Sequence, residues 1–397
     1  MGNDQQLAAG ITGTDTFASP IGLDRIVRKE VSLGAIREMP VPENHIGLQM
    51  LAPFMEVDSD DVIFDYIKDA VSGGMSPARA EDAEAELARK DDIWYGQGRA
   101  SIIDWSEKNA YRASDVQRYR ENMIIAQQVQ GVSGLSLNAP QSAVEAFNAK
   151  VAKDDASRSR RLYNRIEWLI QQAVWTNNIT YNDGKIKFSV DYGRPGGQSN
   201  MAPASGLYDV GTAHDPINDL LALQQQFFDT YGVKFDRAIC SQKILNTFWK
   251  SAKFIPLTGM GGNPAETRVD PNYLMAGWGP DAAQAIIERV TGIKFTVYDS
   301  VYRTRAWGSQ TVTSTRFSPQ DKILFLPSMA DLAEIDDTDI GFAKTLTSPH
   351  PEGNFTAGFY EWEKSEVDPW MHIRGSGVKA FPVFPYLQYT ATMKVLT

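Results

Sequence analysis

The side chains best suited to catalysis or metal binding are few and scattered. The four histidines are His45, His214, His350 and His372, and the one cysteine is Cys240. No two of these residues stand at the spacing of a zinc site, and the His-Glu-x-x-His motif is missing. His214 precedes Asp215 at an expected helix start, and Cys240 lies in an apolar run that favours burial. We therefore expect no metal ion and no catalytic residue.

Glycine-rich loops that could hold a phosphate are incomplete. The stretches "GMGGNP" at 259–264 and "RGSGVK" at 374–379 contain G-x-G. Neither completes the dinucleotide fingerprint, which follows a strand and opens a helix. The P-loop signature and the G-x-S-x-G elbow do not occur either. Both stretches are predicted to be surface loops whose glycines take positive φ, and we expect no cofactor.

Acidic side chains could supply calcium ligands or a catalytic pair. The densest run contains Asp331, Glu334, Asp336, Asp337 and Asp339. It lacks the turn glycine and the closing glutamate of an EF-hand, so a solvated connector is expected. Among 49 acids nothing singles out two as a glycosidase-type pair. A hydrolase with unrecognised paired carboxylates therefore stays an alternative.

The charge balance argues against a protein that grips nucleic acid. The net charge is −10, from 39 basic and 49 acidic residues, whereas phosphate binding normally needs an excess or a patch of Lys and Arg. The longest basic cluster is Arg158, Arg160, Arg161 and Arg165. A solvated helix face, balanced by acids such as Asp154 and Asp155, is favoured over a phosphate site.

Composition indicates a folded chain without a membrane partner. Hydrophobic residues make up 43% and charged residues 22%, which is typical of globular proteins. No window approaches the roughly 18 apolar residues of a membrane span. The first ten residues carry no signal-peptide pattern, and one cysteine cannot form an internal disulfide.

The first third of the chain predicts an arm and a ribbon. Residues 1–50 hold too little apolar material for a core and are expected to form an arm. Residues 51 to about 120 alternate like two strands around an Ala/Glu-rich helix near 76–90, which Ser76 and Pro77 would begin. An isolated two-stranded ribbon is marginal in water, so another chain must cover it.

The rest of the chain predicts a long helix and an α/β region. Residues 142–176 carry apolar residues at helical spacing, and "NDG" at 182–184 turns the chain into a strand. Helices and strands alternate from 215 to 326. The first of these helices is expected to begin at Asp215 and to bury one side. The side chains predicted on that side are Ile217, Leu220, Leu221, Phe227 and Phe228.

The order of these elements resembles that of tailed-phage major capsid proteins with the Hong Kong 97 capsid fold, in the lambda-like major capsid protein E family. The resemblance extends from about residue 20 to 397. The stretches that carry it are "LAPFMEVDSDDVIFDY", "SRSRRLYNRIEWLIQQAVWTNNITYNDGKIKFSVDYG", "HDPINDLLALQQQFFDTYGVKFDRAICSQKILNTFWKS", "TVYDSVY", "DKILFLP" and "SEVDPWMHIRGSGVKAFPVFPYLQYTATMKVL".

The resemblance implies an α+β fold with named domains. These are an N-terminal arm (1–50), an E-loop (51–125) with a helical insertion near 76–90, a P-domain with a long spine helix (126–214), an α/β A-domain (215–326), a P-domain return (327–374) and a C-terminal strand that joins the A-domain (375–397). The stretch from 68 to 100 is longer than the family leads us to expect. No motif places a Lys–Asn cross-link, so non-covalent reinforcement is expected.

The resemblance also implies a function. Hexamers and pentamers of the chain would form an icosahedral shell that encloses double-stranded DNA without binding it specifically. Scaffolding, portal and decoration or cement proteins would be separate partners. The protein would belong to the virion and assemble in the host cytoplasm. An encapsulin-like nanocompartment shell of the same fold is the nearest alternative.

Two groups of residues are predicted to contact other subunits. The apolar residues of the E-loop are Phe54, Ile63, Phe64, Trp94, Tyr95, Ile102 and Trp105. The candidate axis-facing loop of the A-domain consists of Gly259, Met260, Gly261, Gly262 and Asn263.

Overall fold

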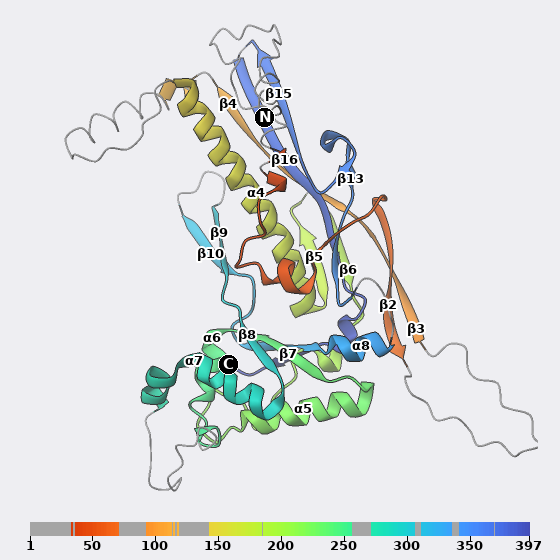
Figure 1. The fold of residues 1–397 in the computed structure, drawn as a ribbon, viewed down its shortest axis with the longest axis vertical. Coiled ribbons are helices and arrows are strands. Elements are labelled where there is room, and N and C mark those ends of the chain that lie inside the picture. Colours follow the sequence, from red (N-terminus) through yellow and green to blue (C-terminus); the bar gives the residue numbers. More distant parts are fainter. Residues whose placement is uncertain are drawn as a thin grey trace, which may run out of the picture. The chain divides into compact units, whose positions relative to one another are not determined.

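The predicted α+β class is confirmed in a computed structural model (Figure 1). It describes residues 33–70, 93–118, 143–255, 271–305, 311–335 and 341–397, apart from the single positions 35, 113, 116, 185 and 369. The described residues divide into two compact units. One holds those up to 40, from 104 to 162 and from 348 to 379, and the other holds the remainder. Helix α4 and strand β16 run through both ranges.

The first unit is built on a long β-hairpin. Strand β15 (Phe359–Val367) pairs antiparallel with β16 (Trp370–Val383), from Phe359 opposite Val378 to Val367 opposite Trp370. Strand β4 (Ile103–Arg112) also pairs with β16. The predicted ribbon over residues 51 to about 120 is therefore shorter than expected, because its last strand belongs to this sheet.

The stretch "RGSGVK" is not the predicted surface loop but part of β16. Its two glycines are needed because aromatic rings lie directly on the strand. A Cβ on Gly375 would overlap the indole ring of Trp362, and one on Gly377 would overlap the ring of Tyr360. The glycines thus make room for close packing, which a G-x-G pattern alone does not distinguish from a turn.

Four buried charges join helix α4 (Ala143–Thr176) to this hairpin. Arg158 pairs with Asp155 one turn away, and its Nη2 lies 3.5 Å from Glu361 Oε1. Arg374 Nε lies 3.4 Å from carboxylate oxygens of both Asp155 and Glu361. The prediction of a solvated face is therefore wrong for Arg158, which is fully buried. Its two acidic partners compensate the cost of desolvation.

The second unit contains the predicted α/β region. Its sheet has the strand order β17-β11-β7-β8. The strands are β7 (Phe235–Cys240), β8 (Lys294–Val297), β11 (Lys322–Pro327) and β17 (Ala391–Lys394). Strands β7 and β8 are parallel and the other two pairs antiparallel. The chain's last strand thus joins this sheet over a shorter stretch than the predicted 375–397.

Three helices accompany this sheet: α5 (Pro216–Tyr231), α6 (Gln242–Phe248) and α7 (Pro271–Thr291), the last interrupted at Gly279. Asp215 caps α5 by accepting from the Asn218 N–H, and Gly232 ends it with φ 70°. These start and stop signals are confirmed. Aromatic side chains fill the core, including Phe227, Phe235, Phe248, Trp249, Phe254, Phe295 and Phe325.

Shorter strands complete the second unit. Strand β1 (Phe54–Glu56) runs parallel to β12 (Lys344–Thr347), which pairs with the end of β16. Three two-stranded sheets are β2 (Asp61–Ala70) with β3 (Ile93–Ser101), β5 (Asn178–Asn182) with β6 (Lys187–Asp191), and β9 (Val301–Arg305) with β10 (Val312–Arg316). Helix α8 (Met329–Ile335) follows β11.

One buried carboxylate holds three segments of this unit together. Glu167 of α4 is fully buried and accepts four hydrogen bonds. Its donors are Gly47 N–H (2.9 Å), Leu48 N–H (3.0 Å), Gln171 Nε2 (2.8 Å) and Tyr298 Oη (2.7 Å). Burial, and then the Glu167 charge, raise the pKa of Tyr298, so the phenol keeps the proton that it donates.

Replacing Gly47 is predicted to destabilise this junction. A Cβ there would stand 2.6 Å from Glu167 Oε2, so Gly47→Ala must displace the carboxylate from its donors. We expect a loss of about 1–3 kcal/mol in the free energy of unfolding, as for other overpacked sites, measured by urea denaturation. Gly196→Ala is the matched control, because nothing lies within 4 Å of its Cβ position. Equal effects of the two variants would contradict this account.

Candidate assembly surfaces

The β2–β3 ribbon pairs only with itself among the described strands. Its register runs from Asp61 opposite Ser101 to Ala70 opposite Ile93, with an irregularity after Ile67. Asp61 closes the base, because its carboxylate accepts from Ser101 Oγ at 3.0 Å and lies 3.3 Å from Arg99 Nη2. The ribbon therefore leaves the body at a fixed point and has no further strand to support it.

The β9–β10 hairpin is a second self-paired ribbon, and it is exposed almost throughout. All five residues of β10 and four of the five in β9 are exposed. Only Tyr302 is half-buried, with its ring 4.9 Å from that of Phe317. A two-stranded ribbon without a covered face is marginal in water. This hairpin is accordingly a candidate contact surface.

An acidic turn links β1 to β2. It spans Glu56 to Asp61 with the sequence EVDSDD, and its four acidic residues are exposed. Backbone hydrogen bonds fix both ends: Val57 N–H donates to the Thr347 carbonyl, and Ile102 N–H donates to that of Asp60. The turn therefore presents its charges from a fixed backbone.

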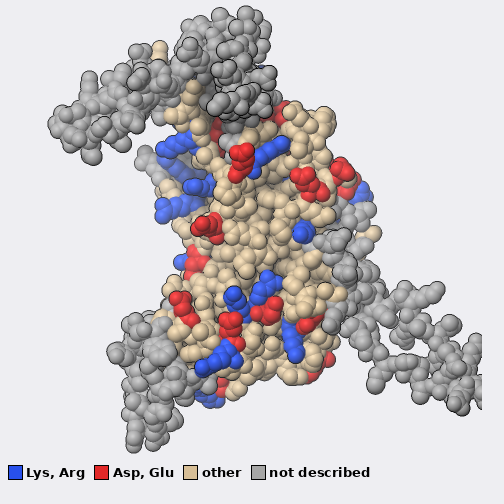
Figure 2. Space-filling model, in the orientation of Figure 1, with Lys and Arg blue, Asp and Glu red and all other residues tan. Residues whose placement is uncertain are grey.

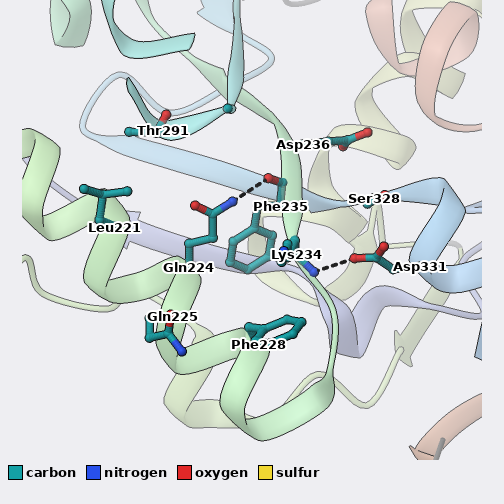
Figure 3. A pocket seen from close by; sticks show the side chains of 11 residues that line it. Leu221, Gln224, Gln225, Phe228, Lys234, Phe235, Asp236, Thr291, Ser328 and Asp331 are labelled. Atoms are coloured by element: carbon teal, nitrogen blue, oxygen red, sulfur yellow. Dashed lines mark hydrogen bonds between the residues drawn. The ribbon is translucent and has the colours of Figure 1, made fainter. Parts of the chain in front are cut away.

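A hollow of about 770 Å³ opens beside helix α5 (Figure 3). Leu221 and Phe228 line it and are 38% and 43% exposed, so the prediction that both lie on the buried side of α5 is wrong. The helix turns them away from the sheet, and Lys234 Nζ lies 4.9 Å from the centre of the Phe228 ring. The backbone N–H of Lys234 donates to Asp331 on the opposite wall.

A strained aromatic residue stands at the turn between β13 (Pro349–His350) and β14 (Thr356–Ala357). Phe355 has φ 57° and is 76% exposed. Positive φ is unusual for a bulky residue and costs energy. The turn is held from within the first unit, where the His350 ring stacks on Tyr360 with centroids 3.9 Å apart.

The surface charges are mixed over most of the visible described face. In Figure 2 basic and acidic groups are interspersed in its lower part, while several basic groups lie next to one another at its upper left. Of the four clustered arginines, Arg160 is exposed and Arg161 pairs with Glu107 at 2.6 Å. Arg165 lies 5.4 Å from the Trp168 ring centre. These contacts explain Arg161 and Arg165 without a phosphate.

The predicted subunit contacts fall into four groups. Phe54 is half-buried, with its ring 6.5 Å from that of Tyr163. Ile102 and Trp105 are buried within the chain, at 7% and 8% exposure. Ile63, Phe64, Trp94 and Tyr95 belong to the ribbon backbone described above, and their side chains lie outside the described part. The loop 259–263 and the helix predicted near 76–90 lie outside the described residues.

The residues expected to be chemically inert are buried. Cys240 is 1% exposed, and burial raises the pKa of its thiol. Burial lowers the pKa of His214 and His372 below the ordinary 6.5, with Arg374 adding to the effect on His372. In the described part of the chain no group of three or more His, Cys, Asp or Glu could hold a metal. None of its helices has the length and hydropathy to cross a bilayer.

No family model and no curated protein matches the sequence. Solved structures resemble it over most of its length. A protein described as a prophage capsid protein from E. coli CFT073 is 14% identical with a TM-score of 0.48, covering 98% of each chain. The capsid of cyanophage P-SCSP1u is 8% identical with a TM-score of 0.43, covering 87% of this chain and 86% of the other.

An encapsulin complex from Synechococcus elongatus is 9% identical with a TM-score of 0.35, covering 93% of this chain and 96% of the other. At TM-scores below 0.5 these likenesses do not assign a function by themselves. What the chain does must follow from its own elements.

Sequence reasoning missed the two exposed surfaces of the second unit. The hairpin was visible in the alternation of "VYRTR" and "VTSTR", which marks two strands. Its exposure was not visible, because alternation does not tell whether either face is covered. The hollow beside α5 was missed because Leu221 and Phe228 fit the apolar spacing of a core face.

Acid is predicted to destabilise the unassembled chain through two of its buried histidines, His214 and His372. Their folded-state pKa lies below the unfolded value, so stability is complete above pH 6.5 and falls as the pH drops below it. The slope is at most about 1.4 kcal/mol per pH unit for each group. Nearby carboxylates, Asp219 for His214 and Asp155 for His372, oppose the shift.

Urea unfolding between pH 5 and 8 measures this slope. The double variant His214→Phe/His372→Phe replaces each imidazole by a phenyl ring, which keeps an aromatic ring at both positions but removes both titrations. The free energy of unfolding should therefore change less steeply with pH in this variant than in the wild type. Carboxylates titrate in both proteins and cancel in the comparison. Identical slopes would show that the histidines are not responsible.

Proposed function

We propose that this chain is the major capsid protein of a tailed phage, with the Hong Kong 97 type of fold. The main observation in support is that β2 with β3, and β9 with β10, form two-stranded sheets that no other described strand joins. Among the described residues of the β9–β10 hairpin, only Tyr302 is half-buried and the other nine are exposed. Ribbons of this kind need a partner, and a second copy is the partner that is always present.

The order of the elements supports the assignment. The β2–β3 ribbon precedes the long helix α4, which leads into the β5–β6 hairpin and then into the α/β sheet. In the proposed fold the ribbon is the E-loop, α4 the spine helix of the P-domain, and the sheet β17-β11-β7-β8 the A-domain. The first 50 residues would form the arm, and the loop 259–263 would face the capsomer axis.

The proposed role is structural and not catalytic. Hexamers and pentamers would close an icosahedral shell around double-stranded DNA without binding it specifically, which the net charge of −10 favours. Scaffolding, portal and decoration or cement proteins would be separate partners. Assembly would take place in the host cytoplasm, and the shell would become part of the virion.

Electron microscopy and sedimentation velocity of the purified full-length chain test the proposal. We expect closed particles of megadalton mass in equilibrium with capsomers. A monomer at every protein and salt concentration would overturn the proposal. Particles isolated with one stoichiometric protein cargo would instead identify an encapsulin-like compartment.

Removing the E-loop ribbon is predicted to stop assembly without unfolding the body. Asp61 and Ser101 are paired, so an Asn-Gly turn can replace residues 62–100 and close a two-residue hairpin. We expect a thermal unfolding midpoint near that of the unassembled wild type, but no closed particles. Shells of normal size and stability would count against the ribbon's role.

A further inference from the structure

One face of the β9–β10 hairpin is basic. Across an antiparallel pair, opposite residues share a face and neighbours along a strand alternate. The register places Arg305 opposite Val312, Arg303 opposite Ser314 and Val301 opposite Arg316. Three arginines and two valines therefore share one face, while Tyr302 and three threonines occupy the other. In a chain of net charge −10 this is a local reversal of sign.

The basic face is exposed and held in place at its base. Val301 and Val312 are 42% and 55% exposed. Arg316 Nη1 lies 3.0 Å from Asp299 Oδ1, which fixes the end of the hairpin to the body. Among the described residues Arg303 makes no ion pair, so its charge is available to another molecule.

The acidic turn Glu56–Asp61 offers the complementary charge. In the described part of the chain, Glu56 and Asp58 also make no ion pair, and both are exposed. The hydrogen bonds of Val57 and Ile102 hold the turn in one conformation. Preorganised surfaces of opposite sign bind with less ordering cost than flexible ones.

The two surfaces are placed to join different copies of the chain. Within the second unit, β9–β10 lies on one side of the C-terminal half of α4, and the β2–β3 ribbon that the turn begins lies on the other (Figure 1). Complementary patches on opposite flanks make a head-to-tail contact, which repeats from copy to copy and can close a ring.

We propose that the basic face of the β9–β10 hairpin binds the acidic turn Glu56–Asp61 of a neighbouring copy. This inference rests on the proposed function, because it names a contact by which capsomers form. Exposed ion pairs are individually weak and are screened by salt. The contact gains its effect because every subunit of a ring makes it once as hairpin and once as turn.

Charge reversal in the full-length chain tests the contact. Arg303→Glu/Arg305→Glu and, separately, Asp58→Lys/Asp60→Lys should each raise the protein concentration needed for assembly at least tenfold. The chain that carries all four substitutions should assemble like the wild type, because the two signs are exchanged and not lost. Restored assembly also excludes misfolding as the cause. The control Lys243→Glu/Lys250→Glu changes the same charge on two exposed lysines, one in α6 and one in the turn after it, and should have no effect.

The outcomes separate this contact from the proposed function. If the wild type forms no particles, the proposed function fails. If the wild type assembles and both reversed variants assemble equally well, the contact is overturned. Failure of the quadruple variant to recover, with both double variants folded, also overturns it. An electrophoretic shift of duplex DNA that is lost only in the hairpin variant would show that the basic face binds nucleic acid instead.

Discussion

The second unit depends on a charge that is placed where no water can reach it. The Glu167 carboxylate is fully buried on α4 and takes donors from residues 47–48 and from Tyr298. A buried carboxylate is tolerated only when its oxygens are satisfied. The helix, the segment before β1 and the end of β8 must therefore meet in one arrangement. Gly47 follows from the same constraint, since no side chain fits between its backbone and the carboxylate.

The ribbons β2–β3 and β9–β10 both start from the packed part of the second unit. The β2–β3 ribbon begins after the turn that follows β1, and the β9–β10 hairpin begins after β8, close in sequence to two of the segments that Glu167 holds. Exposed strand edges are a hazard, because any other strand can pair with them. On the hairpin, arginines on one face and threonines on the other limit such pairing. The same polar side chains that limit strand pairing at the hairpin edge also favour a partner surface of opposite charge.

The elements that the sequence predicted well are those with local signals. Asp215 and Pro216 predict the start of α5, and the apolar spacing of 142–176 predicts α4. Both signals are local, because helix caps and periodicity act within one element. The failures concern residues whose role depends on a distant partner. Arg158 can be buried because Glu361 lies 3.5 Å from it, and residue 375 of β16 must be a glycine because the Trp362 ring covers it. The exposed basic face follows from the hairpin register, which no single strand reveals.

Buried and exposed charges have different uses in this chain. The cluster of Asp155, Arg158, Glu361 and Arg374 is removed from solvent, so breaking it is costly and salt has little effect on it. The proposed contacts between copies need the opposite property. In the proposed shell each contact must be weak enough to reopen while the particle forms, and exposed ion pairs are individually weak. Exposed pairs on rigid turns meet this need, because salt and concentration shift their equilibrium while the buried network keeps each unit folded.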